Sequence, residues 1–248
     1  MATPHLSSPG SASAAGTAGA YVRRRHEIET YFDRTAVQAW ARLTSDAPVG
    51  RIRATVRAGR DRMRATLLDW LPADLTGLRL LDAGCGTGAL ATAAALRGAQ
   101  VVAIDLSPTL VDLARTRSLD EVDEGAIEFL AGDMLAPEHG SFDYVVGMDS
   151  LIHYEARDAL AALGRLAPRC RGSVLFTYAP SSPALVVFKA VGKLFPRGNR
   201  SPAIVPVAGD ALHRRLAADE VLRELPTART RRIASGFYTS QALELVRA

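Results

Sequence analysis

A glycine-rich turn between an apolar run and a helix-like run constrains this chain more than any other feature. It spans Leu78 to Ala89, reads LRLLDAGCGTGA, and places glycines at positions 84, 86 and 88 behind Asp82. Glycine allows a tight turn, or a close approach to a ligand, because it has no Cβ. The first N–H groups of the following helix lack partners within the helix and face the same turn. The sequence therefore predicts a strand, a turn and a helix that admit a nucleotide-like ligand.

Three interpretations of the turn are open at this point. The spacing Gly84-x-Gly86-x-x-Ala89, with Asp105 about twenty residues further on, fits a loose dinucleotide-binding fingerprint. A glycine-rich strand–helix corner without any ligand is the second interpretation. The order Asp-x-Gly-x-Gly-x-Gly, which begins at Asp82, instead resembles the first motif of class I S-adenosylmethionine-dependent methyltransferases. In that family the turn packs against the methionine part of the cofactor.

Composition limits the chain to an ordinary α/β protein and excludes several functions. With 248 residues, 48% of them hydrophobic, the chain fits one α/β domain with additions. The net charge of +4 is mild, and no aromatic–basic interleaving supports nucleic-acid binding. Cys85 and Cys170 are too few for a disulfide framework or a metal site, so we expect no bound metal. No apolar run is long enough to span a membrane and no secretory signal is present, so we expect a cytoplasmic protein.

Strands and helices alternate through most of the chain. We expect helices at 23–43, 52–70, 89–97, 156–166 and 210–218 and after Pro108, and strands at 78–82, 101–104, 127–131, 144–148, 174–178, 227–234 and 239–246. The last two strands are joined too closely for a parallel pair, so they form an antiparallel hairpin. The predicted fold class is α/β: a Rossmann-like class I methyltransferase with a seven-stranded, mostly parallel sheet and an antiparallel C-terminal edge hairpin.

The chain divides into three parts. Residues 1–20 hold almost no large apolar groups, and we expect a disordered tail. Residues 21–71 are expected to form an N-terminal helical lid. Residues 72–248 are expected to form the S-adenosylmethionine-binding methyltransferase domain, with a proline-rich insert at 180–208, expected to bind the substrate, that interrupts it after the fifth strand.

Four aspartates end successive predicted strands, where ligands of open α/β sheets bind. Asp105 can accept both ribose hydroxyls, because a carboxylate offers paired acceptors. By resemblance to the family, Asp133 accepts from the adenine amino group and Asp82 lies near the amino group of the methionine part. One such aspartate could be a plain solvated strand end, but four in succession are less easily accidental. The expected cofactor-binding residues are Asp82, Gly84, Cys85, Gly86, Gly88, Asp105, Leu106, Asp133, Met134 and Asp149.

The residues that face the methyl acceptor are harder to identify. His153 follows the fourth strand and could act as a general base or hydrogen-bond donor, or only order its loop. Tyr31 could reach over the pocket from the lid, or be one more core aromatic at helical spacing. The helix at 52–70 carries a row of arginines, which form either a solvated face or a contact with an acidic substrate.

Several separated blocks are similar to the magnesium-protoporphyrin O-methyltransferase family. They read MDSLIHY at 148–154, FTYAP at 176–180, GKLFP at 192–196, RSPAI at 200–204 and SGFY at 235–238. The resemblance implies methyl transfer from S-adenosylmethionine to one propionate carboxylate of magnesium protoporphyrin IX, giving the monomethyl ester in bacteriochlorophyll and chlorophyll biosynthesis. It also implies that Tyr31 and His153 are catalytic, since they match the family's tyrosine and histidine.

The insert is expected to enclose the macrocycle. Phe188 and its aliphatic neighbours would form an apolar wall, and Lys193, Arg197 and Arg200 would hold the second propionate. The apolar segment 185–195 could instead touch a membrane surface, so we expect peripheral association with the photosynthetic membrane to be feasible. The resemblance to the family also implies a contact with the porphyrin-binding subunit of the magnesium chelatase. Two other functions are open: methylation of a quinone, phenol or amine, and porphyrin delivery without catalysis.

Overall fold

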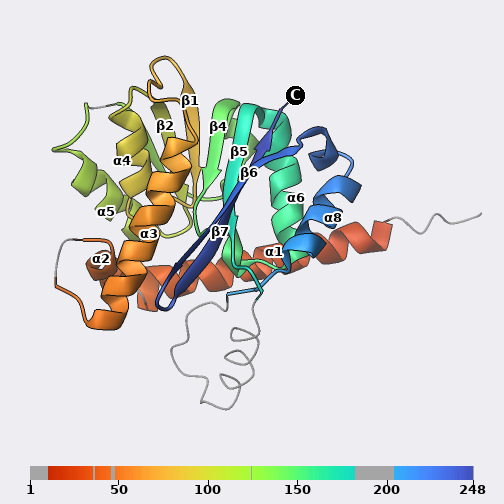
Figure 1. Ribbon diagram of the computed structural model, residues 1–248, viewed down its shortest axis with the longest axis horizontal. Helices are drawn as coiled ribbons and strands as arrows, with labels where there is room; N and C mark the ends of the chain where they lie inside the picture. The colour runs from red at the N-terminus through yellow and green to blue at the C-terminus, as the bar shows by residue number, and fades with distance from the viewer. Residues whose placement is uncertain (1–10, 36, 46–47, 124, 182–203, 248) are drawn as a thin grey trace, which may run out of the picture.

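The computed structural model describes residues 11–35, 37–45, 48–123, 125–181 and 204–247. A seven-stranded sheet in the order β3-β2-β1-β4-β5-β7-β6 lies at its centre (Figure 1). The strands are β1 (Arg79–Ala83), β2 (Gln100–Asp105), β3 (Ile127–Ala131), β4 (Phe142–Gly147), β5 (Cys170–Tyr178), β6 (Thr227–Ser235) and β7 (Tyr238–Val246). β1 to β5 pair in parallel, whereas β7 is antiparallel to both β5 and β6. The predicted sheet and its C-terminal hairpin are confirmed.

Helices cover both faces of the sheet and one of its ends. They are α1 (Ser11–Thr30), α2 (Val37–Leu43), α3 (Arg51–Asp69), α4 (Ala89–Ala95), α5 (Pro108–Ser118), α6 (Ala156–Leu166) and α8 (Gly209–Ala218). Side chains of α3, α4 and α5 pack in one buried cluster, and side chains of α6 and α8 pack in the other. These two clusters are the two faces of a doubly covered sheet.

The N-terminal helices differ from the prediction. α1 begins at Ser11, inside the segment expected to be a disordered tail, and residues 1–10 lie outside the described residues. This segment is rich in alanine, which has the highest helix propensity and needs no apolar face to form a helix. The single helix expected at 23–43 is interrupted by a π-helical turn at Tyr31–Thr35. Asp33 of this turn accepts hydrogen bonds from Ser107 Oγ (3.0 Å) and Thr109 Oγ1 (2.7 Å) at the start of α5.

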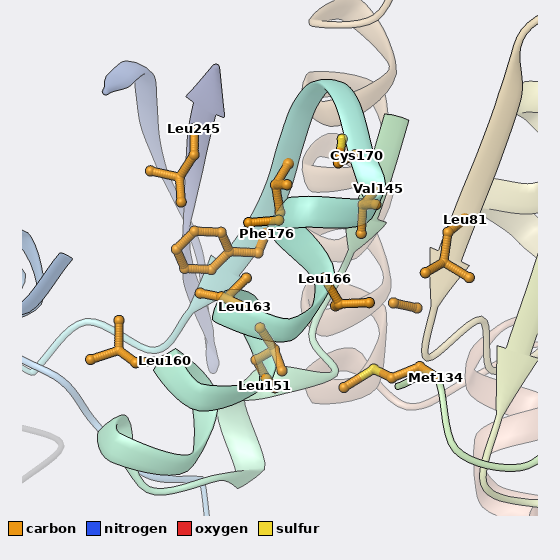
Figure 2. Close-up of a cluster of buried hydrophobic side chains, with 14 of the residues drawn as sticks. Leu81, Met134, Val145, Leu151, Leu160, Leu163, Leu166, Cys170, Phe176 and Leu245 are labelled. Atoms are coloured by element: carbon orange, nitrogen blue, oxygen red, sulfur yellow. The ribbon is translucent and has the colours of Figure 1, made fainter. Parts of the chain in front are cut away.

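One side of α6 is buried against β4 and β5, as the helical spacing of its leucines predicts. Leu160, Leu163 and Leu166 lie three residues apart and are at most 8% exposed. They face Val145 of β4 and Phe176 of β5 (Figure 2). Burying such side chains contributes about 1.5–3 kcal/mol each. This packing fixes β4 and β5, and with them the loop that carries His153.

Of the segment predicted as the lid, α1 and α2 lie across the carboxyl ends of the parallel strands, whereas α3 packs in the cluster on one face of the sheet. The lid from here on means α1, the π-helical turn and α2. α1 passes beneath this end of the sheet in Figure 1, and its Ile28 is only 7% exposed within the core cluster. At the other end of the lid, Arg117 Nη2 of α5 donates to the carbonyl oxygen of Ala41 (2.8 Å), and Arg57 Nε of α3 donates to that of Leu43 (2.9 Å). The lid is therefore docked along its length.

The insert starts and ends beside the loop after β4. Val205 N–H donates to Ile152 O (2.8 Å), and Val207 N–H donates to Ala179 O (2.9 Å). Most of the predicted insert, residues 182–203, lies outside the described residues, and so do the four predicted substrate-binding residues Phe188, Lys193, Arg197 and Arg200. Among the helices that the structure describes, none is long and apolar enough to cross a membrane.

Candidate active site

A cavity of about 800 Å³ lies between the carboxyl ends of the strands and the lid. Most of the predicted site residues line it: Tyr31, Asp82, Gly84, Cys85, Gly86, Asp105, Leu106, Asp133, Met134, Asp149 and His153. Gly88 is the exception among the described ones, because it packs under the turn against Ala114 and Phe129. Within the described ranges, no group of three or more metal-ligating side chains occurs.

The three glycines of the turn adopt a conformation that other residues avoid. Gly84, Gly86 and Gly88 have φ values of +92°, +55° and +82°, all in the left-handed region. A Cβ on Gly84 would overlap Ser150, which follows β4. A Cβ on Gly86 would lie 3.4 Å from Nε1 of Trp40, so α2 covers the turn. The turn is therefore a backbone cradle between the strand ends and the lid.

Asp82 is a buried carboxylate held next to this cradle. Asp82 is 1% exposed, and its Oδ2 accepts no hydrogen bond from the described part of the protein. Burial, and then the charge of Asp105, raise the pKa of Asp82 to about 7, although the Ala91 N–H opposes this shift. An orphaned buried acceptor is costly, and a positively charged donor would relieve that cost. The α-ammonium group of S-adenosylmethionine fits this requirement.

Asp105 is oriented by the backbone at the end of β2. Its Oδ2 accepts from Gly86 N–H (2.8 Å), and its Oδ1 accepts from Ser107 N–H (3.0 Å). Burial raises the pKa of Asp105, and these N–H groups partly offset the rise. A carboxylate has about four acceptor positions, so two remain for ligand hydroxyls. The geometry fits the predicted contact with the ribose diol.

Asp133 receives donors that the sequence did not indicate. Tyr21 Oη and Arg25 Nη1, both on α1, donate to its Oδ1 (3.1 Å) and Oδ2 (2.8 Å). The N–H of Leu135 also donates to Oδ1 (3.0 Å). Tyr21 and Arg25 are four residues apart on α1, so they share one face of the helix, but no pattern in the sequence connects that face to Asp133.

Asp149 has a different environment from the other three strand-end aspartates. Its side chain is 4% exposed and pairs with Arg60 of α3 at 2.7 Å. Hydroxyl groups of β5 and β7 also donate to it: Thr177 Oγ1 (3.1 Å), Tyr238 Oη (3.1 Å) and Ser240 Oγ (3.1 Å). These donors occupy the acceptor positions of the carboxylate. Asp149 therefore ties α3, β5 and β7 to the loop after β4, and it offers little to a cofactor.

The arginines of α3 do not all belong to a solvated face. Arg60 is directed into the cavity, where its guanidinium carbon lies 4.6 Å from the centre of the Trp40 ring. This arrangement fits a cation–π contact. Arg62 Nη2 instead donates to Ala234 O of β6 (3.2 Å). The sequence showed that these residues are basic, but it could not show that Arg60 is partly buried at the cavity.

Tyr31 and His153 meet at the same cavity through the aromatic residue between them. The Phe32 ring contacts Tyr31 at 5.2 Å and His153 at 5.7 Å, both edge to face. His153 is 8% exposed, and its carbonyl oxygen accepts from Arg24 Nε of α1 (2.7 Å). The lid and the loop after β4 are thus joined beside the cradle, where groups that orient a methyl acceptor are needed.

Comparisons with known proteins agree with this geometry. The family model described as "Magnesium-protoporphyrin IX methyltransferase C-terminus" matches residues 147–247, and a general "Methyltransferase domain" model matches residues 80–171. The magnesium-protoporphyrin O-methyltransferase of Rhodobacter capsulatus is 49% identical over 225 residues, which cover 90% of this chain and 97% of that protein. A ubiquinone biosynthesis O-methyltransferase of Xanthomonas campestris is 40% identical, but over only 50% of this chain and 54% of its own length.

A solved structure shares the whole fold. The magnesium protoporphyrin IX methyltransferase of Synechocystis PCC 6803 with bound SAH superposes with a TM-score of 0.79 at 30% identity, covering 90% of this chain and all of that one. The dinucleotide interpretation of the glycine turn is thereby excluded, and S-adenosylmethionine is the cofactor of this fold. The chain belongs to the magnesium-protoporphyrin O-methyltransferase family of S-adenosylmethionine-dependent methyltransferases.

Proposed function

We propose that this protein transfers a methyl group from S-adenosylmethionine to one propionate carboxylate of magnesium protoporphyrin IX, giving the monomethyl ester in bacteriochlorophyll and chlorophyll biosynthesis. The observation that carries the proposal is the 49% identity to the Rhodobacter capsulatus enzyme over 97% of its length. That match extends beyond the cofactor-binding half, into the region of the porphyrin-specific family model.

The strand ends hold the cofactor in an orientation set by three carboxylates. Asp82 is proposed to accept from the α-ammonium group, Asp105 from the ribose hydroxyls and Asp133 from the adenine amino group; the orphaned Oδ2 of Asp82 and the fixed orientations of Asp105 and Asp133 support these roles. When bound, S-adenosylmethionine supplies an electrophilic methyl group on a sulfonium ion. The glycine cradle lets the backbone approach the methionine part closely.

The acceptor needs positioning more than it needs a base. A free carboxyl group has a pKa of about 4 to 5, so the propionate is already a nucleophilic carboxylate at neutral pH. Tyr31 and His153 are proposed to orient this carboxylate in line with the methyl group. The docked lid excludes water from it, and such positioning can supply most of the rate enhancement.

The macrocycle is proposed to lie toward the insert. Ile204 at the end of the insert lines the cavity together with Ile152 and Ala179. Phe188, Lys193, Arg197 and Arg200 remain candidates for the apolar wall and for the second propionate. Replacing residues 182–203 with a short glycine–serine linker should abolish porphyrin binding and leave the affinity for S-adenosylhomocysteine largely intact. Equal loss of both would argue against this assignment.

The protein is proposed to be a cytoplasmic enzyme that makes peripheral contacts with a membrane and with a partner protein. Phe237 and Ile204 line the cavity and are 71% and 46% exposed, which favours contact with an apolar surface. That surface is proposed to be the photosynthetic membrane, with the porphyrin-binding subunit of the magnesium chelatase as a second partner. Flotation with liposomes tests the membrane contact, and pull-down with the purified subunit tests the chelatase contact. Phe237→Ser should weaken binding in both assays.

Methylation of a quinone or phenol is the competing function, supported by the partial match to ubiquinone biosynthesis enzymes. The two are separated by incubating the protein with radiolabelled S-adenosylmethionine and either magnesium protoporphyrin IX or a catechol precursor of ubiquinone. Labelled porphyrin with an unlabelled catechol supports the proposal. Labelled catechol with unlabelled porphyrin overturns it, and label in neither supports a porphyrin-delivery protein without turnover.

A further inference from the structure

Two side chains of the lid helix hold the carboxylate that is expected to recognise adenine. Tyr21 Oη donates to Asp133 Oδ1 at 3.1 Å, and Arg25 Nη1 pairs with Asp133 Oδ2 at 2.8 Å. The side chains of Arg25 and Asp133 are 33% and 22% exposed, so this ion pair is partly shielded from water. Tyr21 is fixed by stacking on Tyr154, with ring centres 5.4 Å apart and planes inclined by 20°.

Counting the acceptor positions of Asp133 shows what this arrangement leaves open. A carboxylate offers about four positions, two on each oxygen. Tyr21 Oη and the Leu135 N–H use those of Oδ1, and Arg25 uses one of Oδ2. One acceptor position remains, on Oδ2. An exocyclic amino group can donate to it without displacing any protein donor.

We propose that Tyr21 and Arg25 are positioning residues for the purine ring of the cofactor: they hold Asp133 with one acceptor position open, so that an amino-purine is selected over an oxo-purine. The proposal rests on the assigned role of Asp133 toward adenine. It adds two residues that act through Asp133 and that belong to the lid, not to the sheet. Cofactor selection is thereby coupled to docking of α1.

The selection follows from the chemistry of the two purines. Adenine presents an N–H donor at its 6-position, whereas hypoxanthine presents a carbonyl oxygen there. A carboxylate held in place would face that oxygen with its own lone pairs, and the two oxygens would repel each other. A carboxylate freed from Tyr21 and Arg25 could rotate or take up water, and the penalty against hypoxanthine would fall. Hydrogen bonds to charged groups are worth enough to change such a ratio by about tenfold.

The same contacts connect the adenine end of the cavity to its catalytic end. Arg24, next to Arg25, donates to the carbonyl oxygen of His153, and Ile28 one turn further on is buried in the core. α1 then leads directly into Tyr31, the first residue of the π-helical turn. A cofactor whose amino group donates to the remaining acceptor position of Asp133 therefore favours the lid position that brings Tyr31 to the cavity.

The test compares two nucleosides that differ at the 6-position, S-adenosylhomocysteine and S-inosylhomocysteine. Their dissociation constants are measured by calorimetry for the wild type, Arg25→Ala and Tyr21→Phe, and Tyr21→Phe keeps the ring that stacks on Tyr154. Arg23→Ala is the matched control, because Arg23 is an exposed arginine of the same helix. We expect the preference for the adenosyl compound to fall about tenfold in each test variant and to be unchanged in the control.

Tryptic cleavage of α1 gives a second readout. In the wild type, S-adenosylhomocysteine should slow cleavage after Arg23 and Arg24 more than S-inosylhomocysteine does, and Tyr21→Phe should remove this difference. A merely structural role would weaken the binding of both nucleosides equally and leave their ratio unchanged, and that result would overturn the proposal. Failure to methylate porphyrin would refute the proposed function but would leave this nucleoside ratio as it is, so the two failures can be told apart.

Discussion

Replacing Asp82 with asparagine should make the ligand-free protein more stable and the cofactor complex weaker. Burial and the charge of Asp105 raise the pKa of Asp82 from 3.8 to about 7. Between these two values the unfolded chain has released the proton and the folded chain still binds it. Stability from this group is therefore lost as pH rises from about 4 to 7. At 1.36 kcal/mol per pH unit, ionised Asp82 costs the fold up to about 4 kcal/mol above pH 7.

Asparagine removes this cost because it is neutral and of similar size, and it can still accept from the Ala91 N–H. At pH 8 we expect the free energy of unfolding of ligand-free Asp82→Asn to exceed that of the wild type by about 1 to 4 kcal/mol. This corresponds to about 2–4 °C in Tm per kcal/mol. At pH 4 the two proteins should be nearly equal. S-adenosylhomocysteine should bind the variant at least about tenfold more weakly, because its ammonium group loses a charged partner.

Urea unfolding at pH 4, 6 and 8, together with calorimetric titration of S-adenosylhomocysteine, measures both effects. Asp219→Asn is a suitable control, since Asp219 is a partly exposed aspartate outside the cavity lining, and an asparagine Oδ1 can still accept from the Val221 and Leu222 N–H groups. An Asp82→Asn protein that is less stable than the wild type at pH 8, or that binds S-adenosylhomocysteine equally well, would refute the reasoning.

Four further substitutions test the catalytic residues, the glycine cradle and the structural role of Asp149. His153→Ala should lower turnover by about 10- to 1000-fold but still bind porphyrin, as measured by quenching of the protein's fluorescence, and Tyr31→Phe should lower turnover as well. Unchanged turnover in His153→Ala would exclude a catalytic role for His153. Gly84→Ala should abolish calorimetric cofactor binding, because a Cβ there overlaps Ser150 at a φ of +92°; normal binding would contradict the cradle. Asp149→Asn should lower the free energy of unfolding by about 2 kcal/mol with cofactor affinity within a few-fold of the wild type, and the reverse pattern would restore Asp149 as a cofactor ligand.

The sheet could be predicted because its signals are local. The strands β1, β2 and β4 are short apolar runs, each is followed by a helix, and the ligand side of a parallel sheet follows from strand direction. Asp105 could be placed in this way, since its orienting donors Gly86 and Ser107 lie in the adjacent turns. The start of α1 at Ser11 was missed, because an alanine-rich segment with no apolar face gives no periodic signal.

Long-range pairing could not be read from the sequence. Asp82 and Asp149 both lie at the carboxyl ends of buried strands and look equivalent in the sequence. Their difference arises from Arg60 and Tyr238, each 89 residues away from Asp149, which satisfy one carboxylate, whereas Oδ2 of the other has no donor. The contacts of α1 with Asp133 span more than 100 residues and were missed for the same reason.

The position of the transferred methyl group tests the central claim most directly. The protein is incubated with methyl-labelled S-adenosylmethionine and magnesium protoporphyrin IX, and the product is examined by mass spectrometry before and after mild alkaline hydrolysis. We predict one labelled methyl group per macrocycle, released as methanol by the base because it is held in a propionate ester. A product whose label withstands the base, or a porphyrin that acquires no label, would contradict carboxyl methylation by this site.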